Sequence, residues 1–569
     1  MTTTQTRPDA THRARPVRRR VLTRPRILVA VALTLWLLNL PALSAAPTHP
    51  FGLLFAAGPW FAIATGLVIA GFIVAVRRGA LVDMVVTLAA YIVIVRVPVS
   101  ALTEVPIYSW TYKHLGVIDY LANNGAVANG VDIYSGWPGF FAAVAWFTSL
   151  SGIAPIDFAH WFTVGYHFAV ALAVYALARA FGQVTRTALV AAFIAELVNW
   201  VGQDYLAPQS LAFLLAIVVL ALLVRSRQYP VAGWLSLPLF AAITVSHQLT
   251  PFWLLGIAIV LGITGHIRPR FIGAAFGVVA LGHLVLNLSA VGNQSLLTGL
   301  DPVANALGRD TGGGSPGHDF SSFADHAVSL GLWGAAALVI VVSVIRNRRI
   351  LGPVWMAGVL AFSAFVLLAG QNYGGEAVFR VFLYSIPGCA ILLAPPLIAL
   401  LTRSHRTFIA GLVVVMLMGL GALEAYYGGW FANLITKSDY ETSARLYETA
   451  PVPTTFILAA PGGAGRSTDA YVPLARAQRQ FEYSLTDWKD WRGNPLTTSR
   501  MFNNLTRDLL GAPTPSTIIL SKQIENYSDY YGLYPPGALN RLLDQLRSSE
   551  HWEPVEDNDS IHVFRLLRT

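Results

Sequence analysis

The chain contains about thirteen apolar runs long enough to cross the hydrocarbon core of a bilayer, which is about 30 Å thick. They lie near 27–46, 54–76, 84–103, 157–178, 187–203, 207–224, 231–247, 250–266, 271–290, 328–345, 351–370, 380–401 and 407–427. Because 55% of the 569 residues are hydrophobic and only 12% are charged, the first four-fifths of the chain cannot be a soluble globule. The sequence therefore predicts an all-α polytopic membrane domain over 27–427.

Short arginine-bearing loops separate many of these runs and predict the orientation of the chain. Cytoplasmic loops of membrane proteins are enriched in Lys and Arg. Alternating the runs from a cytoplasmic amino terminus places all of the following inside: Arg77, Arg78, Arg179, Arg186, Arg225, Arg227, Arg268, Arg270, Arg346, Arg348, Arg349, Arg403 and Arg406. We therefore expect a multi-pass protein of the plasma membrane whose carboxy-terminal domain is extracytoplasmic.

The arginine-rich stretch 1–26 is expected to be a disordered cytoplasmic tail. The small residues at 42–45 leave a cleaved signal peptide open as an alternative, which would not change the later topology. Since loops and tail account for most of the net charge of +9, that charge does not indicate a nucleic-acid partner. The single cysteine, Cys389, has no intramolecular partner for a disulfide.

Two external inserts are expected, at 104–156 and 291–327. The apolar stretch 137–152 is short, and counting it as a span would move every later arginine loop to the outside. We expect it to be a helix in the membrane interface, where its aromatic residues are favourable. The glycines at 312–317 predict a mobile loop or lid in the second insert.

The composition from 428 to 569 is that of a soluble domain. Buried strands are expected at 454–460, 516–521 and 561–565, with helices near 498–511 and 537–549. This pattern favours a small α/β fold. The glycine-rich turn 460–465 lacks the lysine of a phosphate-binding loop, so we interpret it as a plain turn.

The unusual polar motifs fall on the predicted external face. They are Glu104 with 110–114, then 202–205, 247–251, and 371–376 with Arg380. Polar groups near a bilayer are costly to keep, so their presence on one face predicts a single external site. Glu196 lies within a span with Asn199 on its face, and such a residue is functional or pairs with a neighbour.

Three segments of the first insert carry a family resemblance: 110–116 (WTYKHLG), 123–125 (NNG) and 137–140 (WPGF). Together they resemble the first external loop of C-type (GT-C fold) glycosyltransferases, and 247–251, 373–380 and 447–451 resemble actinobacterial members of that group. The resemblance implies about thirteen membrane helices with an external carboxy-terminal domain. It also implies sugar transfer from a polyprenyl-phosphate lipid to a cell-envelope glycan at the outer leaflet.

The sequence departs from the family at its usual acidic pair, since the matching stretch reads Trp110-Thr111-Tyr112. An inverting transfer needs a carboxylate to accept the proton of the acceptor hydroxyl. Glu104 is the nearest substitute, and Asp119 and Asp132 follow, so these three are the candidate catalytic residues. Alternatively, Glu104 is a boundary carboxylate solvated at the interface, and Asp119 lies on a solvated helix face.

Six further residues are candidates for binding the lipid phosphate or the sugar. Guanidinium matches phosphate oxygens in a fixed fork, so Arg380 is the first of them. The others are Lys113, His114, Asp204, His247 and Glu376. Alternatively, Arg380 marks a helix end and pairs with Glu376, while Asp204 and His247 satisfy backbone groups at helix ends.

The cofactor is left open by the sequence. Glu104, Asp204 and His247 have the chemistry to hold a divalent cation, although none of the usual metal-ligand spacings occurs among them. The leading hypothesis is a membrane glycosyltransferase. A polysaccharide polymerase or ligase, or a non-catalytic carrier or assembly protein for envelope polymers, is the alternative.

Overall fold

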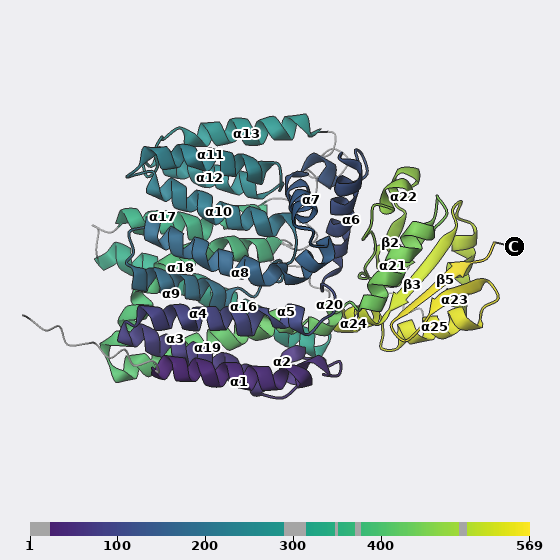
Figure 1. Ribbon diagram of the computed structural model, residues 1–569, viewed down its shortest axis with the longest axis horizontal. Helices are drawn as coiled ribbons and strands as arrows, with labels where there is room; N and C mark the ends of the chain where they lie inside the picture. The colour runs from purple at the N-terminus through teal and green to yellow at the C-terminus, as the bar shows by residue number, and fades with distance from the viewer. Residues whose placement is uncertain (1–22, 289–313, 347–350, 370–376, 489–497, 569) are drawn as a thin grey trace, which may run out of the picture.

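The computed structural model describes residues 23–288, 314–346, 351–369, 377–488 and 498–568. A helical domain is joined to a smaller α/β domain that lies at one end of its helices (Figure 1). The long helices run roughly side by side, and the α/β domain, drawn in green to yellow, sits at the right of the view. The fold class expected from the sequence, a polytopic helical domain with a carboxy-terminal α/β domain, is confirmed.

Each of the thirteen apolar runs forms a helix. They are α1 (Arg24–Ser44), α3 (Trp60–Arg78), α4 (Leu81–Arg96), α8 (Pro155–Ala180), α9 (Thr185–Val198), α10 (Pro208–Arg225), α11 (Pro230–Thr244), α12 (Thr250–Ile263), α13 (Ile272–Leu286), α16 (Pro316–Arg346), α17 (Leu351–Phe362), α18 (Ala377–Arg403) and α19 (His405–Tyr427). Within the described ranges, nine helical segments are long and apolar enough to cross a membrane. Short helices extend three of the nine: α5 (Pro98–Ala101), η3 (Ser363–Ala369) and α20 (Trp430–Asn433). The helices α9, α11, α12 and α13 are shorter, with 14 or 15 residues each.

Arginine-bearing helix ends gather at one end of the helical domain. Arg186 donates to the Val76 carbonyl at 2.5 Å, and the backbone N–H of Arg268 donates to the Ser226 hydroxyl at 2.8 Å. Arg77 lies 4.4 Å from the ring centre of Phe408. These contacts join the ends of α3, α9, α10 and α19, and the α/β domain lies at the opposite end (Figure 1). This is the arrangement that the loop charges require, and the side of the membrane that each end faces stays a prediction.

The first insert contains α6 (Ser109–Asn124), η1 (Ile133–Gly136) and α7 (Gly139–Ser151). With 13 residues, α7 is about 20 Å long and cannot cross the hydrocarbon core. Trp146, Phe147 and Leu150 on α7 are exposed, as suits a helix that lies in the interface. Its position relative to the bilayer remains a prediction.

Two boundaries differ from the sequence expectation. Residues 316–327 were expected in the second external loop, but they are the first turns of α16, which begins at Pro316 with Asp319 in its first turn. Proline and acidic residues both favour a helix start. Arg26, expected in the disordered tail, lies in α1 and pairs with Asp83 at 2.8 Å. Residues 289–313 of the expected loop lie outside the described residues.

The α/β domain is built on a five-stranded sheet in the order β2-β1-β3-β5-β4. The expected strands are β1 (Thr455–Leu458), β3 (Ser516–Ser521) and β5 (Ile561–Leu566), and the expected helices are α23 (Ser499–Leu510) and α25 (Ala538–Ser548). Five further elements were not expected from the sequence: β2 (Glu482–Ser484), β4 (Trp552–Asp557), α21 (Lys437–Thr449), α22 (Tyr471–Ala477) and α24 (Lys522–Tyr531). Strands β1, β2 and β3 are parallel, and β5 pairs antiparallel with β3 and β4.

The α/β domain is docked on both α6 and α20. Gln523 on α24 donates to the Ala432 carbonyl at 2.6 Å, and the backbone N–H of Asp469 donates to Asp119 at 2.8 Å. Gly116 on α6 lies so close to the loop before α22 that an added Cβ would overlap the carbonyl oxygen of Arg466. The insert and the α/β domain therefore form one packed unit.

This close approach predicts that Gly116→Ala destabilises the protein by about 1–3 kcal/mol, because the added methyl must push α6 and the domain apart. The matched control is Gly165→Ala on α8, where an added Cβ meets nothing within 4 Å. There alanine should be neutral or slightly stabilising. Thermal unfolding of the detergent-solubilised variants measures both, and equal midpoints for the two variants would contradict the docking described here.

Candidate functional site

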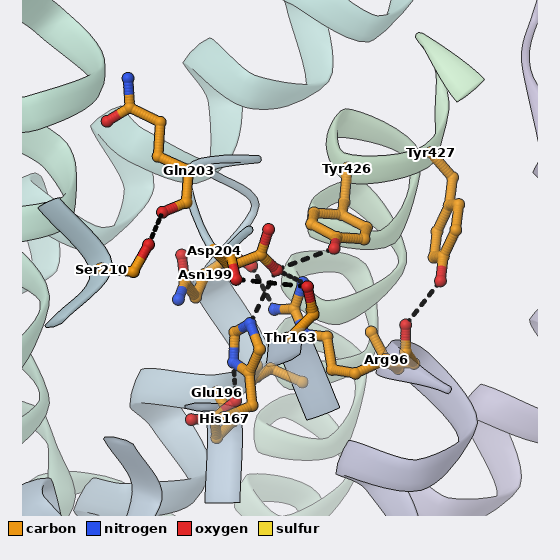
Figure 2. Close-up of polar contacts among 12 residues, drawn as sticks. Arg96, Thr163, His167, Glu196, Asn199, Gln203, Asp204, Ser210, Tyr426 and Tyr427 are labelled. Carbon is orange, nitrogen blue, oxygen red and sulfur yellow. Dashed lines mark hydrogen bonds and ion pairs between the residues drawn. The ribbon is translucent and has the colours of Figure 1, made fainter. Parts of the chain in front are cut away.

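Four buried ionisable side chains meet inside the helical domain, and we call them the buried charge cluster (Figure 2). They are Arg96 on α4, His167 on α8, Glu196 on α9, and Asp204 in the loop between α9 and α10. His167 Nδ1 lies 2.7 Å from Glu196 Oε2, and its Nε2 lies 2.8 Å from Asp204 Oδ2. Arg96 Nη1 lies 3.5 Å from the same Asp204 oxygen. All four side chains are at most 2% exposed, so these charges are shielded from water.

The buried charge cluster fixes the course of the loop 199–207. Arg96 donates to the Asn199 carbonyl at 2.5 Å, and Thr163 donates to the Asp204 carbonyl at 3.2 Å. Tyr426 on α19 donates to Asp204 Oδ2 at 2.8 Å. The loop is thus tied to three helices besides those it joins. Asp204 sits at the centre of these contacts, and its predicted role in substrate binding stays a prediction.

The insert packs on the same loop through His114. The ring of His114 lies 2.9 Å from the Leu206 carbonyl and 3.2 Å from the Tyr134 hydroxyl, and it stacks on Tyr205. Burial lowers the pKa of His114 to about 4. The imidazole is therefore neutral at pH 7, and its observed contacts hold the insert in place.

A second group of polar residues lies just beyond the loop, at the ends of α10, α12 and α18. Arg380 Nε donates to Gln209 Oε1 at 3.2 Å, and the positive charge of Arg380 acts on His247. His247 Nδ1 accepts from the backbone N–H of Thr250 at 3.2 Å, and the Thr250 hydroxyl lies 2.7 Å from that of Tyr384. We call Gln209, His247, Thr250, Arg380 and Tyr384 the Arg380 group.

Gln209 gives the Arg380 group an unused donor. It is the second residue of α10 and only 7% exposed. Its Nε2 is buried and has no hydrogen-bond partner among the described residues. Buried polar groups of proteins are nearly always hydrogen-bonded, so this donor is available to an acceptor that is not among the described residues.

The three candidate catalytic carboxylates have different surroundings. Glu104 lies in the turn between α5 and α6, is exposed, and makes no hydrogen bond or ion pair with the described residues. Asp119 accepts from the backbone of Asp469, and Asp132 accepts from the backbone of Tyr134 at 2.8 Å and from the Tyr471 hydroxyl at 2.9 Å. Asp119 and Asp132 thus tie the insert to the α/β domain and are partly buried, whereas Glu104 is exposed and has no such partner.

Lys113 is occupied at the interface between α6 and the α/β domain. Its ammonium lies 3.7 Å from Glu482 and 4.4 Å from the ring centre of Trp110. Glu482 also pairs with Arg466 at 2.9 Å and accepts a hydrogen bond from Tyr447. Burial alone would raise the pKa of the Glu482 carboxyl, but Arg466 and Lys113 hold it below its usual value. Lys113 is therefore held away from the Arg380 group by a carboxylate.

The structure brings only part of the predicted set together. Asp204 and the Arg380 group are linked through the loop 199–207 and the first turn of α10, while Glu104 contacts neither. Glu376 lies outside the described residues. Within the described ranges, no group of three or more His, Cys, Asp or Glu side chains is placed to hold a metal ion.

Sequence reasoning missed Arg96, His167, Gln209 and Tyr426. A signal was present for two of them. Arg96 and His167 lie within the apolar runs 84–103 and 157–178, and ionisable residues inside a span are rare and usually paired. Gln209 and Tyr426 carried no comparable signal, because a glutamine or a tyrosine near a helix end is common.

No family model and no curated protein matches the chain. Among solved structures, the chain is similar to ArnT from Cupriavidus metallidurans bound to undecaprenyl phosphate, with 13% identity, a TM-score of 0.45, and coverage of 84% of this chain and 97% of that one. The apo structure of ArnT gives 12% identity and a TM-score of 0.44, covering 86% and 98%. The arabinofuranosyltransferase AftD from Mycobacteria gives 14% identity and a TM-score of 0.40, covering 86% of this chain and 41% of that one. Likeness at this level does not carry chemistry from one protein to another.

The Glu482 interface predicts an acid-sensitive contribution to stability. Because the folded-state pKa of Glu482 lies below its unfolded value of 4.5, the stabilisation is present above that pH and is lost as the pH falls through the folded-state pKa. Glu482→Gln should cost about 3 kcal/mol at pH 7, since it leaves Arg466 and Lys113 without their carboxylate. It should also shrink the difference in unfolding midpoint between pH 7 and pH 4.

The control is Asp557→Asn, which breaks the more exposed pair with Arg547 at 2.6 Å. That substitution should change stability by less than about 1 kcal/mol. Equal losses for the two variants would show that the Glu482 interface is no stronger than a surface ion pair.

Proposed function

We propose that this protein is a membrane glycosyltransferase that takes a sugar from a polyprenyl-phosphate donor and transfers it to a cell-envelope glycan on the extracytoplasmic face. The observation that carries the proposal is the Arg380 group, a cation and polar donors at the helix ends beside the insert. Arginine is suited to phosphate because its planar fork matches two phosphate oxygens. A lipid phosphate whose tail lies among the helices would present its headgroup at this depth.

The first turn of α10 strengthens the case for a phosphate. Pro208 occupies the first position of α10 and Gln209 the second. The free N–H groups and the dipole at a helix start favour an anion. Gln209 Nε2, buried and without a partner among the described residues, adds a donor beside Arg380. These groups would stabilise the negative charge on the departing phosphate as the sugar leaves.

Glu104 is the proposed general base. In an inverting transfer, the acceptor oxygen bonds to the anomeric carbon as the bond from that carbon to the lipid phosphate breaks, and the hydroxyl proton passes to a carboxylate. Glu104 is exposed and uncommitted, whereas Asp119 and Asp132 are engaged in contacts with neighbouring groups. Because Glu104 does not touch the Arg380 group, the acceptor and donor would have to bridge the two.

The proposed orientation follows from the helix ends. The arginine-rich end would face the cytoplasm, and the insert, the Arg380 group and the α/β domain would face outward. Undecaprenyl phosphate, the lipid in the ArnT structure, belongs to the same class as the proposed donor carrier. A polymerase or ligase, or a carrier without catalysis, is the alternative that the variants below distinguish.

Arg380→Lys should weaken binding of a polyprenyl phosphate by about tenfold despite keeping the charge, because the ammonium cannot form the two-pronged contact. The control is Arg225→Lys at the opposite end of α10, which should leave the affinity unchanged. Binding is measured by titration of the lipid into protein in nanodiscs. Equal affinities for wild type and Arg380→Lys would remove Arg380 from the phosphate site.

Glu104→Gln should lower the turnover of sugar transfer by about 10²–10⁴-fold with lipid affinity unchanged, since an amide cannot accept the proton. The matched change Asp119→Asn should leave turnover within a few-fold of wild type. Transfer is followed with a radiolabelled polyprenyl-phosphate sugar and isolated envelope glycan. Normal turnover in Glu104→Gln with normal lipid binding would favour the carrier or assembly role.

A further inference from the structure

His167 lies between two carboxylates, with one at each ring nitrogen. Glu196 Oε2 is 2.7 Å from Nδ1, and Asp204 Oδ2 is 2.8 Å from Nε2. The imidazole is 0% exposed, so water does not reach either nitrogen. Both contacts must therefore be satisfied by protons within the group itself.

The number of protons follows from hydrogen-bond chemistry. An ionised carboxylate only accepts, and a neutral imidazole has one N–H and one lone pair. A neutral His167 between two ionised carboxylates would place a lone pair against a carboxylate oxygen at under 3 Å, which is repulsive. His167, Glu196 and Asp204 together therefore carry one more proton than they would with a neutral imidazole and two ionised carboxylates.

The surroundings show that this proton does not sit on Asp204. Asp204 Oδ2 also receives the Tyr426 hydroxyl at 2.8 Å and lies 3.5 Å from Arg96, so the ionised form of Asp204 is well stabilised. Among the described residues, the other titratable groups close to the buried charge cluster are hydroxyls, those of Tyr91 on α4, Tyr108 before α6, Tyr166 on α8 and Tyr427 on α19. The extra proton gives the group zero net charge whether it sits on His167 or on Glu196. On His167 it gives both ring nitrogens an N–H, one donated to each carboxylate, and leaves two positive charges against two carboxylates. A group of zero net charge is the least costly to bury.

We propose that His167 is a positioning residue that is protonated on both ring nitrogens, and that this proton completes a charge-neutral lock holding the loop 199–207. The lock joins α4, α8, α9 and α19 to the loop, which continues directly into Pro208 and Gln209 of α10. His167 thus acts on the Arg380 group through the loop. The protonation of His167 stands without the proposed function, whereas its effect on lipid binding rests on that function.

The test compares the thermal unfolding midpoints of two single variants and their double variant at pH 7 in the same detergent. His167→Gln leaves two carboxylates against one cation, and Glu196→Gln leaves the opposite imbalance. Each should lower the apparent midpoint by about 5 °C or more, because breaking a buried ion pair is costly. The double variant restores neutrality with Arg96 and Asp204, so its loss should be smaller than that of either single variant.

The matched control is Glu424→Gln on α19. Glu424 is 3% exposed, and neither of its carboxylate oxygens has a hydrogen-bond partner among the described residues. Removing its charge should therefore not lower the midpoint. Additive losses in the double variant, or an equal loss for Glu424→Gln, would overturn the lock.

A second measurement reads the protonation directly. In protein labelled with ¹⁵N-histidine, the solid-state NMR spectrum of the double variant is subtracted from that of wild type. The difference should contain two protonated ring nitrogens, and one non-protonated nitrogen would overturn the proposal.

Lipid binding by the same variants separates this proposal from the proposed function. If both the lock and the proposed function hold, the single variant that loses more stability, His167→Gln or Glu196→Gln, binds polyprenyl phosphate at least severalfold more weakly than wild type. The double variant then recovers affinity. If wild type itself does not bind the lipid, the proposed function fails, while the unfolding and NMR results still decide the lock.

Discussion

The end of the helical domain that lies next to the α/β domain depends on the carboxylate of Asp204. A single oxygen of this side chain meets groups from α4, α8 and α19, and the chain on either side of Asp204 belongs to the α9–α10 connection. Charges in an apolar domain are costly unless they are paired, and here each pairing also fixes a helix. Removing Asp204 would leave Arg96 and His167 facing each other without their shared partner.

The loop 199–207 connects the buried charge cluster to the insert and to the first turn of α10. On one side His114 and Tyr205 stack, which seats the insert against the helical domain. On the other side the loop leads into the first turn of α10, where Gln209 contacts Arg380. The α/β domain closes the arrangement, since Glu482 holds Lys113 of the insert. The positions of the insert and the α/β domain at the end of the helices are therefore set by long-range contacts rather than by the local sequence.

These contacts explain what could be predicted from the sequence. The apolar runs identify the helices because a chain in lipid must satisfy its own backbone hydrogen bonds, and the shortness of α7 follows from its 13 residues. The pairing of Arg96 with the Asn199 carbonyl spans 103 positions, and no local pattern encodes it. The three-residue strand β2 is below the length at which alternation is visible, and the polar edge strand β4 reads as a loop.

Long-range contacts also decide which of the candidate site residues lie close together in the structure. Asp204, His247 and Arg380 were singled out as polar residues at helix ends, and they lie along one continuous stretch of structure. Lys113, Asp119 and Asp132 were singled out as charged residues of the first insert, but their partners come from a domain more than 300 residues away. Only the fold shows which polar groups are already used.

The most direct test of a lipid-phosphate site at the Arg380 group is photo-crosslinking with a polyprenyl phosphate that carries a diazirine next to its phosphate. The cross-linked peptides are mapped by mass spectrometry in protein reconstituted in nanodiscs. Labelling of the first turns of α10 and α12 and of the start of α18, competed by unlabelled lipid, is the result that the account predicts. Labelling confined to the arginine-rich end, or labelling that unlabelled polyprenyl phosphate does not compete, would contradict it.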